Sequence, residues 1–308
     1  MKTVHFLFAV GVMFVALGCD KYYPNSSDEV ESLSFTISDF KDGGDDLLTK
    51  TSVGSDGKSF LWSAFDTVGI YPNKGAQVYF EMTSGEAASS ATFDGGGWAF
   101  KASSTYYSYY PFIGDIYLDR NHIPVSYLGQ KQIGTTATSH VGKYDFMYTP
   151  GSSSSSGKVG FHYEHLGSLI RLRCQLPAGT YTKMAVTAPT EAIVLGGYFD
   201  LMSSSPSIIA TSKGKQVGID LSGITVTENQ EFTVYMMLAP VNLAGVEITV
   251  SALNSAKIEY QCKKTPSKAY EAGVTYGLVC TSWTQVPQSM GLIVEDWGDV
   301  GNIGGDAD

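Results

Sequence analysis

The sequence predicts an all-β protein, on the grounds of its composition, its turn spacing and its lack of helical periodicity. Of 308 residues, 34 are Gly and 19 are Tyr, and only 16% are charged, which is typical of sheets and turns. Short apolar segments recur about every 8–12 residues between turn residues, as in a sandwich or barrel. No stretch is amphipathic over three helical turns. With 43% hydrophobic residues, the chain has enough apolar side chains for one or two cores.

Residues 1–18 have the features of a signal peptide. One positive charge, Lys2, precedes an apolar run of about fourteen residues, fewer than the roughly twenty that span a bilayer. The run ends at Cys19 in a motif that resembles the lipobox of bacterial lipoproteins, although Ala16 stands where Leu is preferred. We therefore predict lipidation of Cys19, with an ordinary secretory signal as the alternative. Residues 19–31 are polar and predict a flexible tether.

A short alternating segment begins the folded part. Leu33, Phe35 and Ile37 alternate with small polar residues, and this period of two predicts a strand with one buried face. An acidic, glycine-rich loop from Lys41 to Asp46 is expected to end it.

Further strands are predicted in the first half, separated by Gly-rich turns that supply positive φ angles. They are Phe60–Ser63, Val68–Tyr71, Gln77–Met82, Ala91–Phe93, Trp98–Lys101, Tyr106–Pro111 and Lys143–Tyr148. Five serines, Ser152–Ser156, indicate a loop or linker. We therefore expect an N-terminal β-sandwich over residues 32–158 and a C-terminal one over 159–308.

The second half predicts another series of strands. They are Met184–Thr187, Ile193–Leu201, Val217–Leu221, Phe232–Leu238, Val246–Val250, Ile258–Cys262 and Thr275–Cys280. Phe232–Leu238 is nearly all apolar, as in a central strand covered on both faces. Near the C-terminus, Leu292–Trp297 is β-prone, and such a segment favours aggregation unless it finds a partner.

Charge and cysteine content restrict the partners. The net charge of −10 and the lack of a basic stripe exclude nucleic acid as an expected partner. Apart from Cys19, the cysteines are Cys174, Cys262 and Cys280, which form no CxxC metal pattern. Cys262 and Cys280 either form a disulfide or remain buried free thiols.

No catalytic constellation is present in the sequence. It lacks the G-x-S-x-G, H-E-x-x-H and phosphate-loop motifs. His162 and His165 are three residues apart, so on a strand they face opposite sides and predict no metal site. We therefore expect no catalytic residue, no metal and no cofactor, and a β-sandwich hydrolase is the least supported alternative.

An aromatic run, Tyr106–Phe112, has two interpretations. Tyr107 and Tyr109 share one face of a strand and offer flat rings on which sugars can stack. Because each face of this strand carries tyrosines, at least one set is expected in the core. Core packing is the favoured interpretation.

Taken in order, several motifs resemble the fimbrillin superfamily, the subunits of type V pili on Gram-negative gut and oral bacteria. The matching parts cover most of the chain. They are the signal with Cys19, Thr49-Lys50-Thr51, Phe60-Leu61-Trp62, Asp66–Tyr71, Tyr106–Phe112, Phe161–Leu166, Gly273–Tyr276 and Asp296-Trp297-Gly298.

The resemblance implies two transthyretin-like β-sandwich domains in tandem and export as a surface-exposed outer-membrane lipoprotein. It also implies that a trypsin-like surface protease removes the first strand, residues 32–50, by cutting between Lys50 and Thr51. Lys50 stands where Arg is more usual, so a strictly Arg-specific protease is not implied.

The resemblance further implies polymerisation by donor-strand exchange. Another subunit's strand fills the groove left by Leu33, Phe35 and Ile37. The donor residues expected here are Leu292, Ile293, Val294 and Trp297, in a strand near 291–297.

The predicted function is therefore a structural subunit of a cell-surface fimbria that contributes to adhesion, with other fimbrial subunits as partners. Two alternatives remain open. One is a surface lipoprotein that binds host or bacterial glycans, and the other is an unprocessed anchor or accessory subunit.

Overall fold

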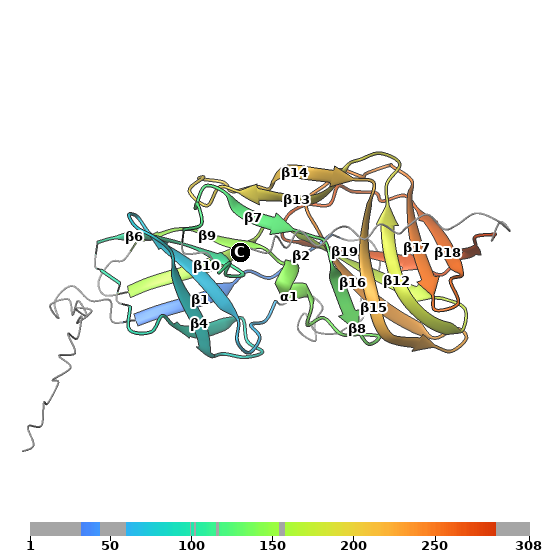
Figure 1. Cartoon of the computed structure of the whole chain (residues 1–308), viewed down its shortest axis with the longest axis horizontal. Helices are drawn as coiled ribbons and strands as arrows, with labels where there is room; N and C mark the ends of the chain where they lie inside the picture. The colour runs from blue at the N-terminus through green and yellow to red at the C-terminus, as the bar shows by residue number, and fades with distance from the viewer. Residues whose placement is uncertain are drawn as a thin grey trace, which may run out of the picture.

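The computed structural model describes residues 32–43, 60–98, 100–101, 103–114, 117–153 and 158–287. It is built almost entirely of strands, which confirms the all-β prediction. The only helix in these ranges is α1 (Val141–Tyr144). Figure 1 shows two lobes, with β1, β4, β6 and β10 in one, β12, β15, β17 and β18 in the other, and α1 between them. No helix in the described ranges is long and apolar enough to cross a membrane.

Seven strands of the first lobe close into a barrel. Hydrogen bonds run around it in the order β1-β10-β9-β6-β3-β4-β5 and return to β1. Its strands are β1 (Ser32–Ile37), β3 (Thr67–Pro72), β4 (Val78–Ser84), β5 (Ser90–Asp94), β6 (Thr105–Tyr110), β9 (Met147–Ser153) and β10 (Lys158–His165). Closure leaves no free sheet edge in this lobe while β1 is in place.

The second lobe contains a four-stranded and a six-stranded sheet. The four-stranded order is β16-β11-β19-β2, and the six-stranded order is β20-β18-β17-β12-β15-β8. The first sheet comprises β2 (Lys41–Asp42), β11 (Ser168–Gln175), β16 (Glu231–Leu238) and β19 (Val274–Cys280). The second comprises β8 (Gln130–Ile133), β12 (Gly179–Thr187), β15 (Gln216–Val226), β17 (Ile248–Asn254), β18 (Glu259–Lys264) and β20 (Thr284–Gln285).

A third, three-stranded sheet has the order β14-β13-β7. It joins β7 (Ile123–Ser126) to the later strands β13 (Ile193–Phe199) and β14 (Ile209–Gly214). Strand pairing thus crosses residue 158 in both directions, because β7 and β8 join later strands while β10 pairs with β1 in the barrel. The division into two domains at this residue, and their transthyretin-like arrangement, stay predictions.

Several predicted elements differ from the structure. Phe60–Ser63 and Trp98–Lys101 are not strands, and the expected loop begins instead with β2. The predicted strand Lys143–Tyr148 begins too early, because Lys143 and Tyr144 end α1 and β9 begins at Met147. Val141 and Tyr144 are both buried, and their spacing of three places them on one face of a helical turn.

The nearly continuous apolar strand β16 lies at the outer edge of its sheet, not at its centre. Two glutamines of β8 cover that edge with their side-chain amides. Gln130 accepts from the Met237 N–H and donates to its carbonyl, both at 2.8 Å. Gln132 accepts from the Tyr235 N–H at 2.9 Å and donates to the Thr233 carbonyl at 2.8 Å. The two amides therefore replace a neighbouring strand, which explains why an edge strand is buried.

Candidate functional site: the strand seam around β1

Strand β1 lies in the barrel between two strands that are otherwise unconnected. It runs parallel to β10 over six residue pairs, with Phe35 opposite Phe161. On its other side it is antiparallel to β5, with Phe35 opposite Ala91. One short N-terminal strand therefore closes the barrel, and we call the space that it fills between β5 and β10 the β1 seam.

The inward face of β1 is apolar, as its alternation predicts. Phe35 is fully buried, and its ring centroid lies 4.7 Å from that of Phe93 and 5.1 Å from that of Phe161. Ile37 is buried, and Leu33 is partly buried against the same core. Burying three such side chains stabilises the barrel by roughly 5–9 kcal/mol gross, at about 1.5–3 kcal/mol each.

The outward face of β1 is held by His162. The Thr36 hydroxyl lies 2.9 Å from its Nδ1, and the Ser38 hydroxyl lies 2.8 Å from its Nε2. Both ring nitrogens thus bond to the β1 segment. This accounts for His162 without a metal, and in the described ranges no three His, Cys, Asp or Glu side chains gather as a metal site would require.

A buried histidine holds the chain just after β1. Nε2 of His165 lies 2.7 Å from the Ser38 carbonyl oxygen, and Nδ1 lies 2.8 Å from Oδ2 of Asp145. The Phe40 ring stacks on the imidazole, with the centroids 3.9 Å apart. The Ser38 carbonyl oxygen can only accept, so Nε2 carries a proton, and Nδ1 donates as well when Asp145 is ionised.

Burial and pairing shift the pKa values of His165 and Asp145. Burial alone would lower the pKa of His165, but the Asp145 carboxylate and the hydrogen bonds to Asp145 and Ser38 raise it overall. Burial raises the pKa of Asp145 against the opposing effect of His165. The two shifts favour opposite charge states of the pair. We assign the ionised pair, in which both ring nitrogens donate, because the Asp145 carboxylate raises the pKa of His165 against the effect of burial.

The chain continues from β1 into the second lobe. Strand β2 adds in parallel to the edge of β19, with a 2.8 Å bond from the Lys41 N–H to the Gly273 carbonyl. The Gly43 N–H donates to the Thr275 carbonyl at 2.9 Å. A Cβ on Gly43 would lie 2.5 Å from the Tyr276 ring, so this close approach requires glycine. Residues 32–43 therefore complete a sheet in each lobe, which the sequence did not predict.

Most of the other predicted site residues cannot be placed. Leu33, Phe35 and Ile37 occupy the seam as described. The rest lie outside the described residues, namely Cys19, Lys50, Thr51, Leu292, Ile293, Val294 and Trp297.

The aromatic run on β6 is mainly core. Tyr109 is 1% exposed, and its hydroxyl donates to Gln77 at 2.6 Å. Tyr110 is also buried and donates to Asp66 at 2.9 Å. Tyr107 is half-buried against the same core. Tyr109 therefore cannot be a sugar-stacking platform in this fold.

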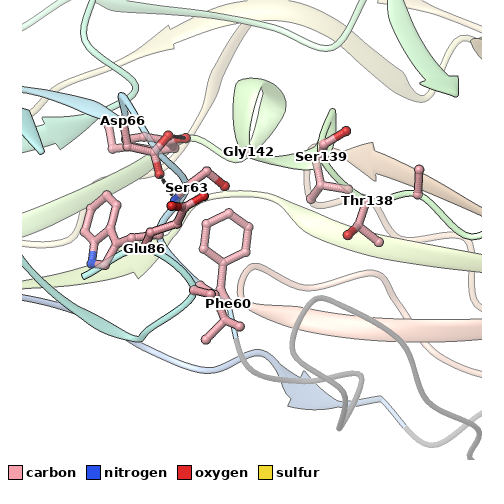
Figure 2. A pocket seen from close by; sticks show the side chains of 13 residues that line it. Phe60, Ser63, Asp66, Glu86, Thr138, Ser139 and Gly142 are labelled. Atoms are coloured by element: carbon pink, nitrogen blue, oxygen red, sulfur yellow. Dashed lines mark hydrogen bonds between the residues drawn. The ribbon is translucent and has the colours of Figure 1, made fainter. Parts of the chain in front are cut away.

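A cavity of about 400 Å³ lies beside Phe60, lined by parts of residues 60–66, 86–87 and 137–142 and by Tyr110. Figure 2 shows Asp66, Ser63 and Glu86 grouped at one end of it, with Ser139 and Thr138 at the other.

Asp66 in this cavity is fully engaged. Its Oδ2 accepts from the Ser63 N–H at 2.7 Å and its Oδ1 from the Tyr110 hydroxyl. Burial raises the pKa of Asp66, while these two hydrogen bonds lower it, and the net shift is upward. The lining contains no His, Cys or Lys.

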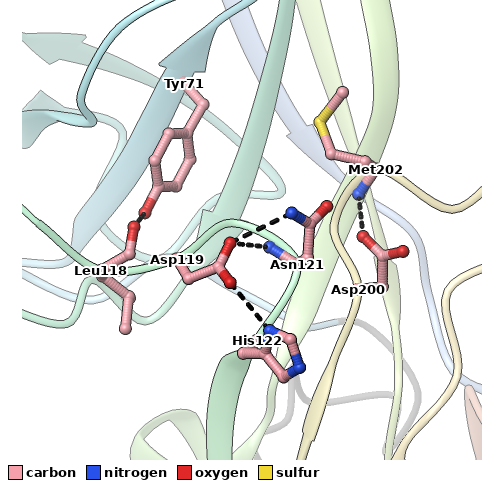
Figure 3. A network of polar contacts seen from close by, with 7 residues as sticks. All are labelled: Tyr71, Leu118, Asp119, Asn121, His122, Asp200 and Met202. Carbon is pink, nitrogen blue, oxygen red and sulfur yellow. Dashed lines mark hydrogen bonds and ion pairs between the residues drawn. The ribbon is translucent and has the colours of Figure 1, made fainter.

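A polar network fixes the loop that precedes β7. Asp119 accepts from the Asn121 N–H at 2.9 Å and lies 2.8 Å from Nδ1 of His122 (Figure 3). These bonds lower the pKa of Asp119. The Tyr71 hydroxyl of β3 donates to the Leu118 carbonyl at 2.6 Å. The network therefore ties the barrel to this loop, which is a structural role.

The buried cysteines are free thiols. Cys262 and Cys280 lie on β18 and β19, which belong to different sheets. No disulfide joins Cys174, Cys262 and Cys280. Of the two alternatives left by the sequence, the structure contains buried free thiols.

Solved structures of two Bacteroides proteins share this fold. A "putative cell adhesion protein" from Bacteroides ovatus ATCC 8483 has a TM-score of 0.53 at 14% identity, covering 83% of this chain and 95% of that chain. Another, from Bacteroides uniformis ATCC 8492, has a TM-score of 0.51 at 14% identity, covering 73% and 92%. No protein-family profile matches the chain, and no curated protein is significantly similar to it in sequence. The chain shares the fold of these Bacteroides proteins.

Proposed function

We propose that this protein is a non-enzymatic structural subunit of a cell-surface fimbria, made as an outer-membrane lipoprotein precursor. The position of β1 carries the proposal. It is a short N-terminal strand that alone closes the barrel, and β2 follows it at the edge of β19. The fold shared with the two Bacteroides proteins, which are described as adhesion proteins, supports the same function.

Removal of the first segment would open both lobes together. A cut after Lys50 by a trypsin-like surface protease separates residues 51–308 from β1, from β2 and from the lipid on Cys19. The β1 seam then lies open between β5 and β10. Strand β19 loses β2 on one side and keeps β11 on the other. Release from the membrane and opening of the groove are thus one event.

A strand from another subunit then refills the seam. The donor that we propose within this chain is the segment Leu292–Trp297. Three or four large apolar side chains contribute roughly 5–12 kcal/mol gross at about 1.5–3 kcal/mol each, and main-chain hydrogen bonds add to this. Subunits joined in this way dissociate slowly, as a fimbria requires.

N-terminal sequencing of protein sheared from cells tests the proposal. We expect Thr51 as the first residue of the polymerised form. The variant Lys50→Ala should retain residues 19–50 and remain monomeric at the membrane, whereas the matched variant Lys58→Ala should be processed normally. If both variants instead begin at a blocked Cys19, the protein is an unprocessed anchor or accessory subunit. Polymers that retain residues 32–50 would overturn strand replacement.

A further inference from the structure

A second cavity lies at one end of the barrel, away from the β1 seam. It has a volume of about 670 Å³ and lies between the β3–β4 turn and the connection from β5 to β6. Ligand sites in proteins are typically about 300–1,000 Å³, so a sugar of two or three units fits. The turn contributes Asn73 and Lys74, and the connection and β6 contribute Trp98, Lys101 and Tyr106.

Trp98 lines this cavity and is held firmly. It is half-buried, and three rings contact it nearly at right angles. The centroid distances are 4.9 Å to Phe100, 5.8 Å to Tyr106 and 6.1 Å to Phe80. In the described ranges, no ring lies parallel to the indole. A rigid indole loses little conformational entropy when a ligand stacks on it.

The position of Lys101 is also fixed by this cluster. Its backbone N–H donates to the Tyr106 hydroxyl at 2.7 Å, and Tyr106 packs against both Trp98 and Phe100. The aromatic cluster therefore fixes the backbone of Lys101 relative to the indole of Trp98.

The charged groups of the lining are all positive. Lys74 on the turn and Lys101 on the connection both line the cavity, and the lining contains no Asp or Glu. Lys74 forms no ion pair with any described residue. This differs from the chain as a whole, whose net charge is −10.

The acidic background does not prevent an anion from binding here. Interactions between exposed charges are largely screened beyond about 8 Å at physiological ionic strength. A bound carboxylate in this cavity therefore interacts mainly with charges close to it, and the charged residues that line the cavity are lysines.

We propose that this cavity binds an acidic saccharide. The apolar face of a sugar ring lies on Trp98, its carboxylate lies beside Lys74, and Asn73 offers hydrogen bonds to hydroxyl groups. An indole beside lysines fits a uronic acid better than an acidic peptide. A uronic acid carries its carboxylate on a sugar ring that can stack, whereas the carboxylates of Asp and Glu lie on flexible side chains. The site replaces the tyrosine platform that the sequence suggested, and it does not depend on Lys50 cleavage.

Titration calorimetry of the intact protein with trigalacturonate tests the proposal. Its fully methyl-esterified form is the matched neutral ligand. We expect at least tenfold weaker binding of the ester, and weaker binding of the acid as salt rises. Equal binding of acid and ester, or no binding of either, would overturn the proposal.

Variants locate the site. Lys74→Gln should weaken binding of the acid about tenfold and reduce its salt dependence, and Trp98→Phe should weaken it while preserving the aromatic cluster. Lys213→Gln, an equal charge change at an exposed residue of β14, should bind like the wild type. Hexaglutamate binding as tightly as trigalacturonate would identify a general anion site and exclude a saccharide site. Loss of binding in Lys213→Gln would place the ligand elsewhere.

Discussion

Nε2 of His165 lies 2.7 Å from the carbonyl oxygen of Ser38, so a fully buried histidine of β10 holds the chain at the point where β1 ends. Asp145 supports the imidazole from the other side. The first segment is thus attached to the barrel by a charged pair as well as by Phe35.

This pair predicts that stability falls as pH rises. The folded-state pKa of His165 is raised, so between its unfolded and folded values the folded protein holds more protons than the unfolded one. The stabilisation from His165 is complete below about pH 6.5, the unfolded value, and is lost as pH rises through the folded pKa. Urea midpoints at pH 5, 7 and 9 should decrease in that order.

Variants separate this pair from other titrating groups. Asp145→Asn should flatten the pH dependence and cost about 3–5 kcal/mol, because it leaves a buried charge without its partner. His122→Gln removes an exposed pair with the same 2.8 Å distance and should change little. An unchanged pH dependence in Asp145→Asn would contradict the assignment.

Phe35 should dominate the attachment of β1. Phe35→Ala leaves a cavity among Phe80, Phe93 and Phe161 and should cost about 3–5 kcal/mol in unfolding free energy. Leu33→Ala is the matched control and should cost less, since Leu33 is only partly buried. Equal losses in urea denaturation would mean that the β1 seam is not organised around Phe35.

The glutamine side chains of β8 should be essential for covering the free edge of β16. Gln130→Leu keeps the volume but leaves the N–H and C=O of Met237 buried without partners, at about 1–3 kcal/mol for each group. The Met237 amide should then exchange its hydrogen faster. Gln175→Leu on the exposed end of β11 is the control. Unchanged protection of Met237 in Gln130→Leu would show that another group covers the edge.

The three buried cysteines should react only after unfolding. Hydrogen bonding to Cys280 and burial raise the pKa of Cys262, and hydrogen bonding to Cys174 and burial raise that of Cys280. The thiolate is the reactive form. Iodoacetamide should therefore label three more cysteines in urea than in buffer, by mass spectrometry without reductant. A count of one more would indicate a disulfide.

Local pattern was sufficient for the strands whose side chains alternate. The period of two places Phe35 and Ile37 on one face, and both are buried. The pattern does not reveal where polar side chains pair with the backbone of a distant strand. Gln130 and Gln132 alternate in β8 like exposed residues, yet both are buried, because their amides pair with a strand about a hundred residues away in sequence.

The sequence by itself determined the all-β class, the apolar face of the first strand and the absence of familiar catalytic motifs, because composition and periodicity are local properties. Only the tertiary structure decided which strands β1 joins. Its pairing with β10 joins residues more than 120 positions apart in the sequence. Strand β2 pairs with β19, which lies near the end of the described chain. Such pairings depend on register and on contacts such as His165 with Ser38, which form only when distant segments pack together.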